Sequence, residues 1–131
     1  MYAADTVQAA IYQDLDGALP CPVYDEAPPG SPMPYVVLGE WTDTPADTHD
    51  LDGSELTVTM HVWSDAPGTR ETNEIMAAID ERLHHGQLVA SGVRIVSIER
   101  EFAEVFREED LTTGRQLRHA VLRYRITVQE E

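Results

Sequence analysis

The sequence has no lysine, and its 131 residues include only one cysteine, Cys21. Without lysine, a Walker-type phosphate site and Schiff-base chemistry are both excluded. A single thiol cannot form a disulfide within the chain, and Cys21 stands between two prolines with no basic neighbour to activate it, so we expect a buried or bystander thiol. The longest apolar runs, such as residues 35–38, are too short to span a bilayer, and we expect no membrane partner.

Arginine is also missing from the first 69 residues, and all nine arginines lie in residues 70–131. Each part holds twelve Asp or Glu residues, so the parts carry −12 and −3 of the net charge of −15. Such an acidic surface repels DNA, RNA and anionic lipid, so specific nucleic-acid binding is not expected. The uneven charge suits subunits that meet acidic surface against arginine-bearing surface, although a generic solubilising surface would have the same composition.

The length of the chain fits one domain, and we expect residues 1–131 to form it. Near the N-terminus, Asp5, Asp14 and Asp16 interrupt any pattern of basic residues followed by an apolar stretch. We therefore expect no signal peptide and synthesis in the cytoplasm.

Periodic apolar residues predict two helices, at about 6–15 and 69–84, with Asp5 capping the first. Strands are predicted at 35–41, 54–63, 93–107 and 117–129. Six prolines in residues 20–34 forbid a helix there, but residues 23–25 can join a sheet edge. This order predicts an α+β fold: a single domain with a mainly antiparallel sheet and two amphipathic helices packed on one face.

Alternation indicates which strand residues face the core. In two strands the expected core residues are Leu56, Val58, Met60 and Val62, and then Ala120, Leu122, Tyr124, Ile126 and Val128. In the strand at 93–107, Val93 and Ile95 alternate, but the later core-facing set, Ile98, Phe102 and Phe106, is out of phase with them. We therefore expect a β-bulge in this strand.

No residues form a convincing catalytic or metal site. His84 and His85 are adjacent at a helix end, where the helix dipole explains them better than shared metal ligation does. His61 and His119 lie on two strands that could bring them together. A calcium-loop alignment on Gly53 places threonine at both strongest ligand positions. We expect no catalytic residue, no metal and no cofactor, and hence no enzyme.

Two groups of side chains are candidates for an interaction surface. Trp41 and Trp63 end the predicted strands that flank an acidic loop, where they would serve an interface or a small core cluster under the loop. Arg123 and Arg125 share one face of the last strand, whereas Arg118 does not. These arginines would meet a partner's carboxylates or, alternatively, pair within the chain with Glu99, Glu101 or Glu104. The expected interface residues are Trp41, Asp47, Asp50, Asp52, Trp63, Glu108, Glu109, Asp110, Arg115, Arg118, Arg123 and Arg125.

Six segments in the right order resemble a family of tail completion, or tail terminator, proteins of long-tailed phages, prophages and phage-derived gene transfer agents. They are residues 9–12 (AAIY), 23–30 (VYDEAPPG), 34–39 (PYVVLG), 56–64 (LTVTMHVWS), 75–79 (IMAAI) and 121–125 (VLRYR). The proline-rich segment and the strand end at 61–64 are the most specific of these. The resemblance covers nearly the whole chain.

The resemblance implies a structural ring, usually of six subunits, at the head-proximal end of the tail tube. The ring would stop tube polymerisation and join the tail to the head, while DNA passes through its lumen without specific binding. The implied partners are copies of the chain itself, the tail tube protein and the head–tail connector or stopper protein. The implied location is the tail of a virion or gene transfer agent particle, and the family has no catalytic residues to carry over.

A function of a different class is also compatible with the composition. The all-acidic first 69 residues suit a small acidic binding module, such as a DNA mimic that inhibits a basic partner. The nine arginines in the rest of the chain count against this alternative. A pull-down that recovered a basic nucleic-acid enzyme would favour it.

Overall fold

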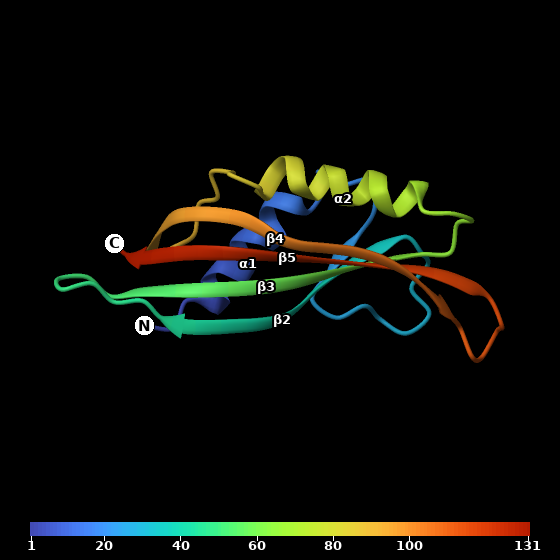
Figure 1. Ribbon diagram of the computed structural model, residues 1–131, viewed down its shortest axis with the longest axis horizontal. Coiled ribbons are helices and arrows are strands. Elements are labelled where there is room, and N and C mark those ends of the chain that lie inside the picture. Colours follow the sequence, from blue (N-terminus) through green and yellow to red (C-terminus); the bar gives the residue numbers. More distant parts are fainter.

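The computed structural model describes residues 1–131 and has all its strands in one sheet (Figure 1). The helices and strands are α1 (Ala4–Leu15), β1 (Val23–Tyr24), β2 (Tyr35–Pro45), β3 (Gly53–Ser64), α2 (Arg70–Leu83), β4 (Val93–Glu109) and β5 (Gln116–Glu130). The strand order is β1-β2-β3-β5-β4, and only β1 and β2 are parallel. The α+β class, the mainly antiparallel sheet and the edge position of residues 23–24 are confirmed.

The face of the sheet that packs against the helices is built by alternate residues of the central strands. In β3 and β5 every predicted core residue is buried, with an exposed fraction of at most 1%. These residues are Leu56, Val58, Met60, Val62, Ala120, Leu122, Tyr124, Ile126 and Val128. Burying an aliphatic or aromatic side chain of this size contributes roughly 1.5–3 kcal/mol. Most of the fold's stability therefore comes from this one face.

Both helices cover that face with a narrow apolar stripe. The stripe of α1 is Val7, Ile11 and Leu15, and that of α2 is Ile75, Ile79 and Leu83. The spacing of four residues places each set on one side of its helix, and both sets join a single hydrophobic cluster with the sheet. Neither helix is long and apolar enough to cross a membrane.

The start of α1 differs from the expectation. Ala3 occupies the N-cap and makes no side-chain capping bond, while its N–H donates to the Asp43 carboxylate of β2 at 2.9 Å. Asp5 lies inside the first turn, so the prediction that it caps the helix was wrong. Its carboxylate still lies near the positive end of the helix dipole.

β2 is longer than predicted and contains a β-bulge between Gly39 and Trp41. Glu40 is the extra residue, and its φ of 44° lies in the left-handed region that non-glycine residues seldom adopt. Beyond the bulge the side chains change faces, so Trp41 pairs with Val58 on the helix-covered side. The connection to β3 is then only residues 46–52.

β4 has two bulges, with Val96 and Glu101 as the extra residues. The first confirms the predicted bulge and brings Ile98 into the core. The second was not predicted, and it turns Phe102 and Phe106 to the opposite face, opposite Arg123 and His119 of β5. Their predicted core positions were therefore wrong, and Phe102 is 36% exposed.

The residues that follow α2 cover part of the outer edge of β4. The His85 N–H donates to the Ile98 carbonyl at 2.8 Å, and the Arg100 N–H donates to His84 Nδ1 at 3.0 Å. The two imidazole rings stack with their centroids 4.0 Å apart. The pair therefore has a structural role at a sheet edge in addition to its place at the negative end of α2.

Candidate interaction surfaces

The second face of the sheet carries no helix, and several predicted interface residues lie on it. We call this side the open face. Its central side chains are Thr57, Thr59, His61 and Trp63 of β3 and His119, Val121, Arg123 and Arg125 of β5. The remaining predicted interface residues lie at the two ends of the sheet, apart from Trp41.

The acidic tip, residues 46–52, connects β2 and β3 and extends from the end of the sheet near both chain termini (Figure 1). Asp47 orders the tip because its carboxylate accepts the Gly53 N–H at 2.9 Å. Residue 53 must be glycine, since a Cβ there would lie 2.7 Å from a backbone oxygen. Asp50 and Asp52 are exposed, and neither carboxylate has an intramolecular partner. The tip therefore presents free negative charge.

Arg123 and Arg125 share one carboxylate on the open face. Arg123 Nε donates to Glu101 Oε1 at 2.8 Å, and Arg125 Nε donates to Glu101 Oε2 at 2.9 Å. Arg125 also pairs with Glu55 of β3. The second bulge of β4 brings Glu101 to this position, and the alternative of pairing within the chain is confirmed for both arginines. These two arginines are therefore already neutralised.

Trp63 is part of an aromatic and histidine cluster at the other end of the open face. Its ring stacks on His119 with the centroids 3.9 Å apart, and Phe106 contacts the same imidazole edge-on at 4.7 Å. His61 Nδ1 and His119 Nε2 lie 2.6 Å apart, so the predicted cross-strand meeting of these histidines is confirmed. The sequence pattern could not show that Phe106 joins them, because the bulge that turns it is not visible there.

Two glutamates complete a hydrogen-bonded chain through this pair. His61 Nε2 lies 2.5 Å from the Glu40 carboxylate, and His119 Nδ1 lies 2.9 Å from that of Glu108. The carboxylates accept from the outer ring nitrogens, and which of the two inner nitrogens donates depends on the tautomers of the two histidines. Glu40 is also the residue at the β-bulge whose φ is 44°.

Trp41 does not join Trp63, although both were expected to flank one loop. Trp41 packs against the core on the helix-covered side, and its indole Nε1 is buried without a hydrogen-bond partner. Trp41 thus packs against the main core and does not form a small cluster under the loop, while Trp63 lies on the open face. Strand register keeps the two tryptophans apart, because Trp41 pairs with Val58 whereas Trp63 pairs with Tyr35 at the start of β2. The bulge at Glu40 then turns Trp41 to the helix-covered side.

The β4–β5 turn lies at the end of the sheet opposite the acidic tip (Figure 1). Asp110 holds this turn by accepting the N–H groups of Thr112 and Thr113, and these bonds lower the pKa of its carboxyl group. Arg115 Nη1 pairs with Asp65 at 2.8 Å, and Glu109 is exposed. This end therefore combines both signs of charge.

Arg118 lies on the helix-covered side of β5, near the same end, directly opposite Arg107 of β4. Neither guanidinium has a carboxylate within 4 Å, and Arg118 reaches only a carbonyl oxygen at 3.5 Å. Sequence reasoning missed Arg107, because only the strand register shows that it lies opposite Arg118. Two like charges in directly opposite positions destabilise a sheet.

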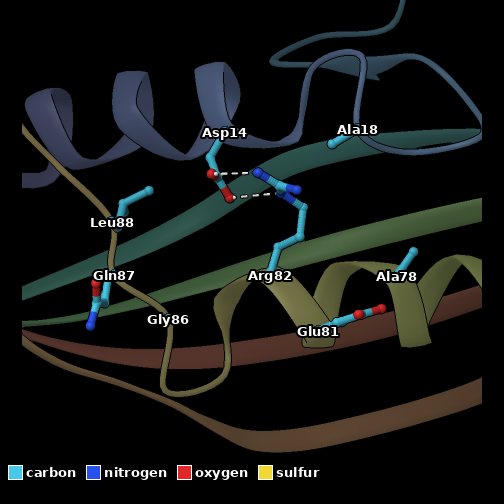
Figure 2. A pocket seen from close by; sticks show the side chains of 8 residues that line it. All are labelled: Asp14, Ala18, Ala78, Glu81, Arg82, Gly86, Gln87 and Leu88. Carbon is cyan, nitrogen blue, oxygen red and sulfur yellow. Dashed lines mark hydrogen bonds and ion pairs between the residues drawn. The ribbon is translucent and has the colours of Figure 1, made fainter.

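A pocket of about 500 Å³ lies between the C-terminal ends of α1 and α2 (Figure 2). Asp14 and Arg82 cross it with two hydrogen bonds, of 3.2 and 3.1 Å, so its main charges satisfy each other. The Asp14 carboxylate raises the pKa of Arg82. No group of three His, Cys, Asp or Glu side chains is arranged to hold a metal ion. The pocket brings together no nucleophile and base.

A model of the family described as "Tail completion protein gp17" matches residues 3–129. The chain belongs to this family. The tail completion protein gp17 of Bacillus phage SPP1 is 29% identical over 97 residues, which are 74% of this chain and 69% of that protein. A chain in the solved virion of a native gene transfer agent particle is 28% identical, with a TM-score of 0.79 over 98% of this chain and 99% of that one.

Membership of the tail completion family confirms the resemblance found in the sequence. It gives the chain a structural role in a phage-type tail and accounts for its lack of catalytic machinery. As a component of a tail, the chain interacts with other tail and head proteins.

Proposed function

We propose that this chain forms a ring, most simply of six copies, on the head-proximal end of the tail tube. The ring ends tube polymerisation and joins the tail to the head connector, while DNA passes through its lumen. Its partners are copies of itself, the tail tube protein and the connector or stopper protein. It is made in the bacterial cytoplasm and becomes part of the particle.

The observation that carries the proposal is the near-complete match to a chain of an assembled gene transfer agent virion. The match covers both chains almost from end to end, so the whole of this fold is present in that particle. Membership of the tail completion family supports the same role. It favours a particle component over the alternative of an acidic DNA mimic.

The charge of the chain supports the passage of DNA. A net charge of −15 per copy gives a ring of several copies a strongly negative field, which DNA phosphates do not bind. The few places where positive charge is free are therefore candidates for contacts with acidic neighbours.

Deleting the gene that encodes this chain tests the proposal directly. We expect tails of uncontrolled length or heads without tails, because nothing would end the tube or join it to the head. Electron microscopy of the particles measures both, with the wild-type gene supplied in trans as the control. Tails of normal length on normal heads would refute the proposal.

Labelling sharpens the test. A small epitope fused after Glu131 should be detected by antibody only at the head–tail junction, and the mass ratio to the connector should give the number of copies. Label along the whole tube would contradict a terminal ring.

A further inference from the structure

The nine arginines divide into two groups by their partners. Six of them pair with a carboxylate of the same chain, and Arg94 donates to Gln129. Only Arg107 and Arg118 have no carboxylate and no amide partner. In a chain with 24 acidic residues, two adjacent guanidinium groups that none of them neutralises are an exception.

These two arginines line one pocket of about 300 Å³. It lies between the β4–β5 hairpin and the turn that leads into α2, with Gly68 and Thr69 on one side and Val105 and Phe106 on the other. Opposite residues of an antiparallel pair have Cβ atoms about 5 Å apart, so both guanidinium groups reach the same opening. Arginine binds carboxylates through two parallel N–H donors, and two arginines together can hold one or two carboxylates. We call this opening the arginine pocket.

The chain itself presents a matching group of carboxylates. The acidic tip carries Asp50 and Asp52 with their carboxylates free, on a loop that projects beyond the sheet. The tip lies beside the pairing of Gly53 with Gln129, whereas the arginine pocket lies beside that of Ser64 with Arg118. At about 3.3 Å per residue these positions are roughly 36 Å apart. The tip cannot reach the pocket of its own molecule, but it can reach that of a neighbour.

We infer that the acidic tip of one copy inserts Asp50 and Asp52 into the arginine pocket of the next copy. The contact is heterologous, because each copy gives its tip to one neighbour and its pocket to the other. Repetition of such a contact with a closing rotation generates a ring. The inference rests on the proposed function for the closure into a ring, but the contact itself is a property of two copies.

Charge reversal tests the contact. Arg107→Glu with Arg118→Glu should reduce incorporation of the chain into particles at least tenfold, and Asp50→Arg with Asp52→Arg should do the same. A chain with all four substitutions should regain incorporation to within about threefold of wild type, because the charges again match. Incorporation is measured by quantitative blotting of purified particles. The control variants, Arg94→Glu and Asp16→Arg with Glu81→Arg, reverse exposed charges elsewhere and should incorporate normally.

Disulfide trapping gives a second readout that leaves the four charged residues intact. Leu51→Cys is in the tip and Thr69→Cys is in the wall of the pocket, and both residues are exposed. Cys21 is buried and stays as a reference. After mild oxidation, the double variant should give a ladder of covalent multimers on a non-reducing gel, from particles or from the concentrated protein. Each single variant should stay at the mass of one chain.

The outcomes separate this inference from the proposed function. Full incorporation of the Arg107→Glu, Arg118→Glu chain, or no ladder from a double variant that is present in particles, would overturn the contact. Loss of incorporation without rescue by the four-substitution chain would assign the pocket to another protein and would also overturn it. A ladder from the purified chain together with normal tails in the deletion strain would leave the contact standing and refute the proposed function.

Discussion

The two faces of the sheet are built on different principles. On the helix-covered face, apolar side chains alternate from Leu56 to Val62 in β3 and from Ala120 to Val128 in β5, and they are buried with the helices in one cluster. On the open face, the same two strands carry threonine, histidine, arginine and Trp63, held by a few specific polar and aromatic contacts. The first face thus supplies the main core, whereas the second presents polar and aromatic side chains that can contact other molecules.

The largest difference between the faces should be seen by truncating neighbouring residues of β3. Leu56 is fully buried, and Leu56→Ala should lower the free energy of unfolding by about 3 kcal/mol, because it removes buried methyl groups and leaves a cavity. Thr57→Ala, one residue later on the open face, should cost less than about 1 kcal/mol. Urea unfolding followed by circular dichroism measures both. Equal losses would show that the open face contributes to the core.

Within the open face, truncating a residue of the histidine cluster should lower the stability of the fold, as truncating a core residue does. His119 is 8% exposed, and His119→Ala removes two hydrogen bonds and the stack on Trp63. We expect a loss of about 2 kcal/mol. His119→Phe keeps an aromatic ring against Trp63 and should recover about half of that loss. If both substitutions are neutral, the cluster does not stabilise the monomer and is free to serve contacts alone.

On the helix-covered face, Tyr124 is a buried residue that makes a polar contact, as His119 does on the open face. Its hydroxyl donates to Asp80 of α2 at 2.8 Å, and Tyr124→Phe should cost about 1.5 kcal/mol. Burial, and then this bond to Asp80, raise the pKa of Tyr124 above its ordinary value of 10.0. The neutral phenol is therefore favoured in the folded state, and its contribution is complete below about pH 10 and declines above it.

The effect of Tyr124 on stability at alkaline pH can be separated from the effect of the Cys21 thiol. Burial, and then the charge of Glu71, raise the pKa of Cys21 to about 11, so Cys21 also lowers stability at alkaline pH. Unfolding of wild type and of Tyr124→Phe at pH 8 and pH 10.5 should show a smaller alkaline loss in the variant. An equal loss in both would contradict the assignment to Tyr124.

The smallest expected effect concerns the backbone of Glu40, the extra residue of the β-bulge in β2. Glu40 has a φ of 44°, which costs a residue with a Cβ about 1 kcal/mol more than glycine. Glu40→Gly and Glu40→Ala both lose the bond to His61, so the difference between them isolates the strain. We expect the glycine variant to be about 1 kcal/mol more stable in urea unfolding. If the alanine variant is the more stable, residue 40 is not strained.

The sequence was sufficient for the helix-covered face and insufficient for the open face. Strict alternation in β3 and β5 and the four-residue stripes of the helices predicted the core, because both patterns are local. The predicted core facings of Phe102 and Phe106 failed for one shared reason. Each follows a β-bulge, and one extra residue reverses the facing of everything after it without changing the composition.

The interface candidates show the same limit. Arg123 and Arg125 were found as a pair on one face, but their partner Glu101 could only be one of three glutamates until the bulge was known. Arg107 was not a candidate at all, because its neighbour across the sheet, Arg118, is eleven positions away in the chain and is set by register. Long-range pairing is the information that one sequence does not contain.

The outer edge of β4 limits how this protein can associate. His84 and His85 occupy main-chain groups in its middle, while two bulges and several charged residues interrupt the rest. A foreign strand therefore cannot continue the sheet in register along this edge, which is the route by which exposed sheets aggregate into fibres. At this edge, contacts with another molecule can therefore use charged side chains but cannot extend the main-chain ladder. Salt screens contacts between exposed charges, so raising the ionic strength should weaken the contact between the acidic tip and the arginine pocket.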